Sequence, residues 1–547
     1  MAIARIACRA QVGLAAPPVE VEVYLGNGLP SFSIVGLAAT EVKESKERVR
    51  AALAHTGFEW PAGRITVNLA PADLPKDGGR FDLAIAVGIL AASGQVAQAA
   101  PSRLAAHEFL GELGLAGELR PVRGTLLAAR AAAAAGRELI LPRANAPEMR
   151  LLPMLGVRAG ADLLEVCTAL DGKTVLPLAR ELEWPAVGDV GGAAAGGSGA
   201  AAGATTISLA DVCGQTLAKR ALRVAAAGAH SLLMIGPPGC GKSMLAQRLS
   251  SLLPPLEDAE ALDVAAVASV AGWSAAMGAT GIAAGHGASV APGTMPAWPV
   301  PRPFRAPHHT ASVGAIIGGG PRARPGEITL AHLGVLFLDE FPEFDRRVLE
   351  ALREPLESGV VSISRAGLQA EYPARFQLVA AMNPCPCGHH GDHARPCRCR
   401  PRDLARYRAR LSGPLLDRID LRVALETVSE VDLAAYRQAL DGGASLPRQP
   451  AEHDRAQICR ARARQQARQG CLNAVLAGNL LEHCAQPTRA ALQTLALARE
   501  KLGLSLRGTH RALRVARTLA DLEDSEEVVE AQVAEAIQLR RGLGGED

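Results

Sequence analysis

One stretch of the sequence has the residue types and spacing that bind the phosphates of a nucleotide. Residues 236–243 read GPPGCGKS and match the pattern G-x-x-x-x-G-K-[ST] in full, after an apolar run and before a helical one. Glycines here let backbone N–H groups converge on phosphate at a helix start. Lys242 would meet the β- and γ-phosphates, and Ser243 would hold Mg²⁺. The expected nucleotide-binding residues are Gly236, Pro237, Pro238, Gly239, Cys240, Gly241, Lys242, Ser243 and Met244.

Polar residues follow two further apolar runs. GVLFLDE ends in Asp339 and Glu340, and FQLVAAM is followed by Asn383. An Asp at a strand end can hold Mg²⁺ through water, and a Glu beside it can orient an attacking water. The carboxyl ends of adjacent parallel strands face one crevice, so Asn383 is expected near the γ-phosphate. Alone, an Asn-Pro pair marks only a turn.

Residues 383–399 read NPCPCGHHGDHARPCRC and hold four of the 11 cysteines. Four thiolates can close a tetrahedral Zn²⁺ site, although the usual spacing is C-x₂₋₄-C rather than C-x-C. The three nearby histidines offer substitute ligands, and thiols without a metal are the alternative. A catalytic metal is not expected here, because the chemistry is already assigned to Mg²⁺ and ATP. The possible structural zinc ligands are Cys385, Cys387, Cys397 and Cys399.

The elements that must position these residues alternate between short apolar strands and helices from residue 209 onward, which predicts a parallel α/β sheet. The N-terminal part predicts strands at 20–26 and 64–70, a helix at 44–57, and a helix followed by a strand over 125–142. Residues 186–206 are rich in Gly, Ala and Ser and indicate a tether. After about residue 428 the chain is expected to be helical and basic.

Composition and length set further bounds. The chain has 547 residues, 48% of them hydrophobic, and a net charge of +3. This is a globular composition for about three domains, in which any nucleic-acid surface must be local. No apolar run reaches the ~18 residues of a membrane span. The start lacks a signal-type apolar region, so the cytoplasm is the default compartment, where clustered cysteines suggest metal binding or catalysis.

A family resemblance rests on DVCGQTLAKRALRVAAAGAHSLLMIGPPGCGKSMLA, GEITLAHLGVLFLDEF, NPCPCG and RLSGPLLDRIDL. These segments resemble the Mg-chelatase-like AAA+ ATPases, specifically the ComM/YifB family, and the resemblance covers essentially the whole chain. It implies Walker A and Walker B motifs, a sensor-1 Asn at Asn383 and an arginine finger at Arg418. SLRGTHRALRVARTLADL resembles the sensor-2 helix, with Arg507 the better match and Arg511 its rival. Val212 and Gly214 would lie by the adenine.

The resemblance also implies an oligomer and a DNA substrate. An arginine finger must come from a neighbouring subunit, so a ring is expected, with a hexamer as the family's pattern. An ion pair with Asp417 or Asp420 is the alternative for Arg418. Family members are described as hexameric helicases that promote branch migration in natural transformation, where incoming single-stranded DNA is recombined into the chromosome. A magnesium chelatase subunit that inserts Mg²⁺ into porphyrin is the competing expectation.

Three segments are candidates for DNA contact. Residues 264–326 contain no Asp or Glu but carry arginines, which suits a polyanion; a packed insertion is the alternative. GVVSISRAGLQAEYPARF predicts a hairpin with Arg365 near its tip, unless Arg365 is a solvated turn residue. A basic helix near residue 460 is the third candidate, for binding to DNA or at an interface, or else a solvated helix. The residues are Arg302, Arg305, Arg322, Arg324 and Arg365, with Arg455, Arg460, Arg462, Arg464 and Arg468 in the helix.

The N-terminal part carries a second resemblance. APADLPKDGGRFDLAIAVGIL and GELGLAGELRPVRGTLLAARAAAAAG resemble the proteolytic domain of Lon, which has a ribosomal S5 domain 2-like fold. Lon proteases use a Ser–Lys dyad, but Arg80 stands at the Ser position and Leu126 at the Lys position. We expect the fold without the peptidase, with an ion pair between Arg80 and Asp82, in a domain that binds DNA, regulates the ring or docks partners.

The expected fold class is therefore multidomain α/β. It combines an N-terminal Lon-protease-like α+β domain at 1–180, a flexible linker at 181–206, an AAA+ P-loop core with a parallel sheet at 207–428, and a C-terminal helical lid at 429–547. The expected cofactors are ATP and Mg²⁺, with structural Zn²⁺ an open question. The expected partners are single-stranded or branched DNA and further copies of the chain, and no membrane.

Overall fold

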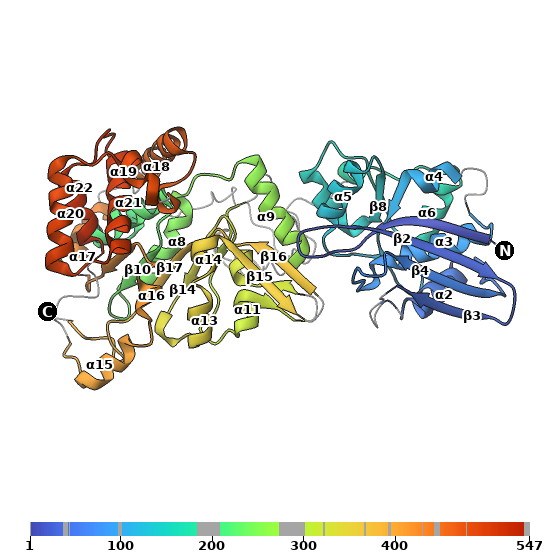
Figure 1. Ribbon diagram of the computed structural model, residues 1–547, viewed down its shortest axis with the longest axis horizontal. Coiled ribbons are helices and arrows are strands. Elements are labelled where there is room, and N and C mark those ends of the chain that lie inside the picture. The colour runs from blue at the N-terminus through green and yellow to red at the C-terminus, as the bar shows by residue number, and fades with distance from the viewer. Residues whose placement is uncertain are drawn as a thin grey trace.

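The structure is a computed structural model in which the elements follow one another along a long axis (Figure 1). The N-terminal elements lie at one end, a parallel sheet lies in the middle, and the C-terminal helices lie at the other end. The residues that it describes are 2–36, 42, 44–96, 101–182, 208–272, 301–320, 323–365, 368–391, 395–428, 430–441, 449–476 and 478–540.

The N-terminal elements form a mixed sheet of seven strands in the order β3-β4-β2-β1-β5-β8-β9. Pairing is antiparallel for β1 with β2 and for β2 with β4, and parallel for the other neighbours. The strands are β1 (Ala2–Arg9), β2 (Pro18–Gly26), β3 (Ser31–Val35), β4 (Arg64–Ala70), β5 (His107–Phe109), β8 (Glu138–Pro142) and β9 (Val157–Gly160). The small pair β6 (Glu112–Leu113) and β7 (Leu119–Arg120) stands apart.

Helices cover this sheet, and those expected from the sequence are confirmed within a few residues. They are α2 (Ser45–His55), α3 (Asp82–Ala92), α4 (Pro101–Ala106), α5 (Thr125–Ala134) and α6 (Leu163–Leu170). The helix α3 is buried almost all round, so its sequence lacks an amphipathic pattern. Gly136 follows α5 with φ +71°, a left-handed conformation that suits the end of a helix and favours glycine.

The central sheet is wholly parallel, as predicted, with the order β11-β14-β17-β10-β18. Its strands are β10 (Leu232–Ile235), β11 (Phe304–Arg305), β14 (Val335–Leu338), β17 (Gln377–Met382) and β18 (Leu421–Ala424). The helix α8 (Lys242–Leu252) follows β10, and α7 (Thr216–Gly228) precedes it. A hairpin of β15 (Val360–Arg365) and β16 (Leu368–Pro373) confirms the predicted antiparallel ribbon.

Both faces of the central sheet are buried, and the strand alternation divides the core in two. Leu232 and Met234 of β10 join one hydrophobic cluster, whereas Leu233 and Ile235 join another. Because successive side chains of a strand point to opposite faces, β10, β14 and β17 each supply both clusters. The first cluster includes the C-terminal helices, and the second includes α13 (Arg346–Ala351) and the β15–β16 hairpin.

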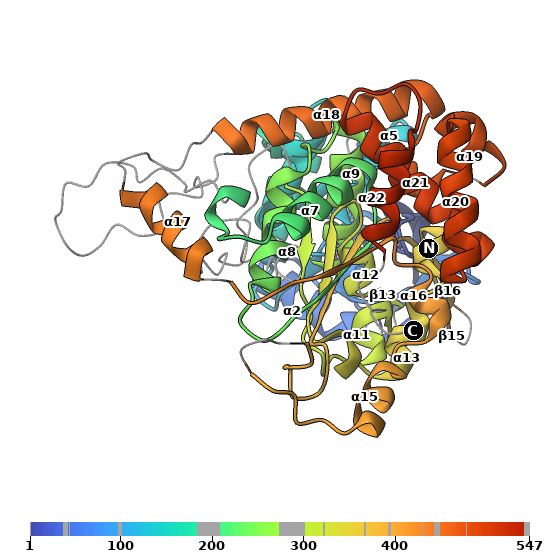
Figure 2. The same ribbon diagram turned by 90° about the vertical axis from the view of Figure 1, so that its left-hand side faces the viewer.

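The C-terminal residues are helical, as expected (Figure 2). The long helix α21 (Leu506–Leu522) packs against several of the others and supplies much of the buried surface on this side. The helices are α17 (Glu430–Asp441), α18 (Gln449–Gln469), α19 (Gly478–Ala485), α20 (Arg489–Leu502), α21 (Leu506–Leu522) and α22 (Glu530–Gln538).

The helix α9 (Asp258–Ala271) connects the central and N-terminal parts. It follows the sheet's helix α8 in the chain, yet Ala261, Val264 and Ala265 belong to the N-terminal hydrophobic cluster. Its Ser269 carbonyl accepts a hydrogen bond of 2.9 Å from the Gly124 backbone N–H at the start of α5. Figure 1 shows α9 between the two parts. The residues 186–206 that predicted a tether lie outside the described residues.

Among the residues that the structure describes, none of the helices combines the length and the apolar composition needed to cross a bilayer.

Candidate nucleotide site

A loop between β10 and α8 forms one wall of a 620 Å³ cavity. Gly239 and Gly241 have φ values of +81° and +94°, which lie in the left-handed region that favours glycine. A Cβ at either position would meet no atom within 4 Å, so both glycines are required by backbone conformation rather than by packing. Gly241 is the N-cap of α8, whose first N–H groups have no partner within the helix. This geometry suits a bound phosphate.

Lys242 is the main cation at this cavity. Its Nζ donates hydrogen bonds to the carbonyl oxygens of Gly236 at 2.7 Å and Pro237 at 2.9 Å, and to Oδ1 of Asn383 at 3.1 Å. Only 9% of the residue is exposed, and burial lowers the pKa of its ammonium below the ordinary value. Its hydrogen-bond partners are neutral, so the charge of Lys242 is left available for an anionic ligand.

The polar residues predicted from three separate segments come together here. Asp339 follows β14, Asn383 follows β17, and the neighbouring strand β10 leads to Lys242. Ser243 Oγ donates a hydrogen bond of 2.7 Å to Oδ2 of Asp339. A hydroxyl and a carboxylate in contact are hard oxygen donors that suit Mg²⁺, so these residues fit the expected ion. When bound there, Mg²⁺ would neutralise charge on the phosphate oxygens.

His309 is a further residue of this site that the sequence motifs do not predict. Its Nδ1 lies 2.9 Å from Oε2 of Glu340, and both residues line the cavity with Lys242 and Asn383. Glu340 has φ +51°, an uncommon value for a residue with a side chain. The rings of His308 and His309 are 4.1 Å apart. A histidine has no spacing rule relative to a glutamate 31 residues later in the chain, and only the fold brings the two together.

Val212 and Gly214 do not line the cavity among the described residues. Val212 is 4% exposed and packs in the core, and a Cβ on Gly214 would lie 3.3 Å from the Asp432 carboxyl. Their segment still touches the loop, because Nε2 of Gln215 donates to the Cys240 carbonyl at 3.5 Å. The expected adenine contact stays a prediction.

Arg418 and Arg507 line a different cavity, of 330 Å³, that has no residue in common with the one around Lys242. Arg418 Nη2 lies 2.6 Å from Oε1 of Glu357 and its Nη1 donates to the Pro414 carbonyl at 2.8 Å. Arg418 therefore forms an ion pair, but with Glu357 and not with Asp417 or Asp420 as the alternative expected.

The two candidates for the sensor-2 arginine differ in their surroundings. Arg511 Nη1 contacts Oδ1 of Asp420 at 2.5 Å and the Arg418 carbonyl at 2.8 Å. Asp420 also accepts a hydrogen bond of 2.9 Å from His230. Burial alone would raise the pKa of Asp420, but His230 and the arginines lower it below its usual value. Arg507 is exposed and makes no ion pair with the residues that the structure describes.

Two of the predicted DNA contacts require correction. Arg305 has a 3% exposed side chain and pairs with Glu327 at 2.6 Å, so it is buried within the protein. Arg302 donates to the Pro254 and Leu333 carbonyls at 2.6 and 2.7 Å and pairs with Glu260 at 3.1 Å. These arginines stabilise the fold and do not present a charge to DNA. Arg324 is exposed, whereas Arg322 and the side chain of Arg365 lie outside the description.

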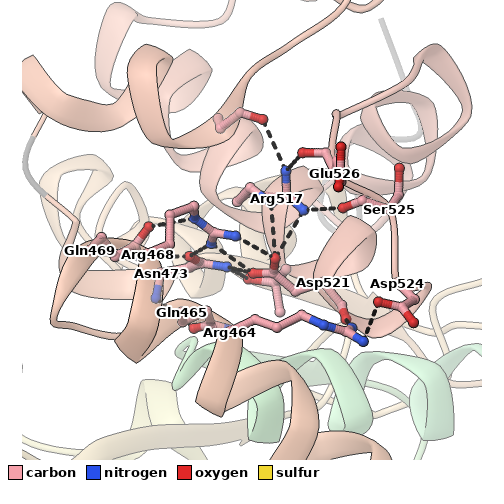
Figure 3. A network of polar contacts seen from close by, with 12 residues as sticks. Arg464, Gln465, Arg468, Gln469, Asn473, Arg517, Asp521, Asp524, Ser525 and Glu526 are labelled. Atoms are coloured by element: carbon pink, nitrogen blue, oxygen red, sulfur yellow. Dashed lines mark hydrogen bonds and ion pairs between the residues drawn. The ribbon is translucent and has the colours of Figure 1, made fainter.

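The basic helix α18 also serves mainly to hold the C-terminal helices together (Figure 3). Arg468 contacts Oδ1 and Oδ2 of Asp521 at 2.7 and 3.0 Å, and Arg517 reaches the same carboxylate at 2.9 Å. Arg464 donates to the Asp521 carbonyl at 2.6 Å, and Arg462 to the Ala226 carbonyl at 2.8 Å. The DNA-binding expectation is wrong for these three residues of α18; Arg455 and Arg460 are exposed.

The expected Arg80–Asp82 ion pair is wrong as well. Asp82 is fully buried and contacts Nε of Arg48 at 2.7 Å; burial raises the pKa of its carboxyl. Arg80 instead donates to Oε1 of Gln11 at 3.0 Å and to the Arg123 carbonyl. Leu126 is buried in the core. The two positions that would carry a Ser–Lys dyad thus hold a buried arginine and a leucine.

The four cysteines of residues 383–399 converge. The Sγ atoms of Cys385, Cys387, Cys397 and Cys399 all lie within 4.8 Å of one another. Cys385 is buried and the other three are half-buried, and all four are free thiols. Such a cluster could bind a metal ion of the Zn²⁺ type.

The comparisons with known proteins agree with this arrangement. Three family models match: "Magnesium chelatase, subunit ChlI" over residues 208–433, "Subunit ChlI of Mg-chelatase" over 21–145 and "Magnesium chelatase, subunit ChlI C-terminal" over 449–540. The parallel sheet and phosphate-binding loop, with these matches, define a Mg-chelatase-like protein of the AAA+ class.

Relatives that match over their full length identify the family within this class. The chain is 44% identical to the competence protein ComM of Haemophilus influenzae over 99% of this chain and 98% of that protein. It is 43% identical to the uncharacterized protein YifB of Salmonella typhimurium over 99% of this chain and 97% of that protein. A shorter match, 34% identical over 22% of this chain and 14% of the relative, is to the DNA replication licensing factor mcm-6 of Caenorhabditis briggsae. The chain belongs to the ComM/YifB family.

Proposed function

We propose that the protein hydrolyses ATP with Mg²⁺ as a DNA motor. The observation that carries this proposal is the convergence of Lys242, Ser243, Asp339 and Asn383 on one cavity behind a phosphate-binding loop. Lys242 would bind phosphate oxygens, and Ser243 with Asp339 would hold the ion. Glu340 would accept a proton from the attacking water, and Asn383 would orient that water.

The position of Arg418 and Arg507 supports a ring of subunits. Both arginines line a cavity that is separate from the one containing Lys242. An arginine that stabilises charge on the transferring phosphoryl group must reach that group. We therefore infer that the two arginines act on the nucleotide of a neighbouring subunit, and a closed ring, with six subunits as the expected number, gives every nucleotide such a neighbour.

The substrate that we propose is single-stranded or branched DNA. A relative that is 44% identical over nearly its whole length is named as a competence protein, and a shorter match is named as a DNA replication factor. The proposal is that ATP hydrolysis drives branch migration as a helicase while incoming DNA is recombined in natural transformation. Arg324, Arg455 and Arg460 are the DNA-contact candidates that the structure describes as exposed.

The experiment is ATP hydrolysis by the full-length protein without DNA, with single-stranded DNA and with a three-way junction, followed by strand displacement on the junction. We expect DNA to stimulate hydrolysis several-fold and displacement to require ATP. Lys242→Ala serves as the control that removes the phosphate contact. ATPase activity that does not change with DNA, together with no strand displacement on the junction, would contradict the DNA motor proposal.

The same assay distinguishes the DNA motor from a competing proposal, a subunit that inserts Mg²⁺ into a porphyrin. The name of the matching family models favours this second proposal. A protein with that role would hydrolyse ATP without a response to DNA. A structural Zn²⁺ at the four cysteines is a further cofactor that belongs to the proposal.

A further inference from the structure

The four-cysteine cluster has the dimensions of a zinc centre. Four thiolates at 2.3 Å from one Zn²⁺ are about 3.8 Å apart in a tetrahedron. The Sγ atoms of Cys385 and Cys387 are 3.3 Å apart, those of Cys385 and Cys397 are 3.8 Å apart, and those of Cys387 and Cys397 are 3.6 Å apart. A disulfide would bring two sulfurs to about 2.05 Å and leave the other pair aside. The observed spacing favours one shared ion.

The surroundings of the cluster suit the charge of such a centre. Four thiolates with one Zn²⁺ carry a net charge of −2. Three arginines, Arg398, Arg406 and Arg410, line the 630 Å³ cavity that Cys387 and Cys399 also line, against two carboxylates. The backbone N–H of His390 donates to Cys385 Sγ at 3.3 Å. Hydrogen bonds to the ligands and nearby cations are what stabilise a thiolate centre.

The segment that carries the cluster packs closely against the phosphate-binding loop. Gly388, between the two cysteine pairs, has φ +85° and lies so close to the loop that a Cβ would be 2.7 Å from Cδ of Pro238. Cys385 is two residues after Asn383, whose Oδ1 receives the hydrogen bond from Lys242. The cluster therefore supports the nucleotide cavity from both the loop and the end of β17.

The other side of the cluster leads to the second cavity. Cys399 is followed by α15 (Pro401–Arg408) and α16 (Gly413–Leu416), and Arg418 comes two residues after α16. Tyr407 and Leu415 of these helices are buried in the same hydrophobic cluster as β17 residues. A fixed cluster thus links the residue that faces the nucleotide, Asn383, to the arginine proposed to face a neighbour's nucleotide.

We infer that the four cysteines bind one Zn²⁺ and that this centre holds the phosphate-binding loop in its nucleotide-binding conformation. Zinc is structural: it closes a loop in which the backbone–backbone hydrogen bond between described residues is the short turn from the Cys385 carbonyl to the Gly388 N–H at 3.0 Å. Its loss frees Gly388 from Pro238 and weakens ATP binding. The second half of this inference rests on the proposed nucleotide site, whereas zinc binding does not.

The first experiment measures metal. Full-length protein purified without chelators is expected to contain about one zinc per chain by elemental analysis, as a single four-thiolate site requires. The double variant Cys397→Ser/Cys399→Ser, which changes the two half-buried ligands of one C-x-C pair, should lose it. Cys213→Ser and Cys471→Ser, which change half-buried thiols outside the cluster, should keep it. Wild-type protein with much less than one zinc overturns the inference, as does a double variant that keeps its zinc.

The second experiment measures coupling on the wild-type protein, so that it does not depend on a variant that folds. Zinc is removed with a chelator and then restored with Zn²⁺ alone, and binding of a fluorescent ATP analogue is measured at each stage. We expect the Kd to rise at least fivefold and to recover. Lys242→Ala should lose nucleotide binding but keep its zinc. An unchanged Kd after zinc removal overturns the coupling; zinc without any nucleotide binding in the untreated protein counts instead against the proposed ATPase.

Discussion

Nδ1 of His309 lies 2.9 Å from Oε2 of Glu340. The histidine follows β11 in the chain, and the glutamate follows β14. The contact orients the carboxylate of Glu340, whose side chain is about half exposed. The backbone of Glu340 is in the left-handed region. His309 is therefore a positioning residue for the proposed general base. Lys242 and Asn383 line the same cavity.

Replacing His309 with Ala should lower kcat for ATP hydrolysis by about tenfold, because a general base that is no longer oriented loses much of its effect. The KM for ATP should stay within about twofold, since His309 is assigned no contact with the nucleotide. His309→Asn keeps an N–H donor and should restore most of kcat. If instead KM rises and kcat is unchanged, His309 binds the nucleotide and does not position Glu340.

The arrangement of two separate cavities predicts complementation between inactive variants. Lys242→Ala lacks the phosphate contact and Arg418→Ala lacks the proposed finger, so each alone should be inactive. In an equal mixture about a quarter of the subunit contacts pair an intact nucleotide site with an intact Arg418. We expect ATPase activity to recover toward that fraction of the wild-type rate. A mixture as inactive as its components would show that Arg418 does not act across subunits.

The network around Asp521 predicts where the C-terminal helices are vulnerable. Asp521 is fully buried and accepts hydrogen bonds from Arg468, Arg517 and Asn473 (Figure 3). Asp521→Ala leaves two arginines without their carboxylate, which should cost roughly 3–5 kcal/mol. Hydrogen exchange of the α21 amides measures this loss. Asp524→Ala is the matched control: this side chain is 78% exposed, so its loss should cost under about 1 kcal/mol.

His332 predicts a pH dependence of stability. Its Nδ1 accepts a hydrogen bond of 3.1 Å from the Arg375 backbone N–H. Burial, reinforced by the charge of Arg375, lowers the pKa of His332 from 6.5 to about 4. Between these two pH values His332 is protonated in the unfolded chain but neutral in the folded chain. The free energy of unfolding therefore falls as the pH drops from about 6.5 toward 4. At pH 5 the loss is on the order of 2 kcal/mol.

Thermal melting at pH 7.5 and pH 5 of the wild type and His332→Asn tests this. The Asn side chain keeps an acceptor for the Arg375 N–H but does not titrate. The variant should therefore lose less stability between the two pH values. Equal losses would mean that the acid sensitivity comes from other groups.

Lys242, Asp339 and Asn383 of the nucleotide cavity could be predicted from the sequence because local spacing and strand ends fix them. A phosphate-binding loop needs its glycines and lysine within eight residues, and the ends of parallel strands must meet at one edge. Partners of buried charges obey no such rule. Residues 264–326 lack acids and therefore suggested a DNA surface, but Glu260 and Glu327, just outside the two ends, pair with Arg302 and Arg305.

The same limit applies to the N-terminal part. Arg80 and Asp82 are near neighbours in sequence, which suggested an ion pair, yet they begin a buried helix on which they point to different partners, Gln11 and Arg48. The strands β2, β4 and β8 and the helices α2 and α5 followed from local patterns, whereas α3 is buried almost all round and gives no periodic signal.

The helix α9 changes how the chain can be cut. A break in the Gly- and Ala-rich stretch at 186–206 looks harmless by sequence, but the fragment before it would lack Ala261, Val264 and Ala265, which fill its own hydrophobic core. The fragment after the break would carry that apolar helix face without its cover. Each half would be expressed as an incomplete protein that tends to aggregate. The linker is therefore not a suitable boundary for making separate fragments of this chain.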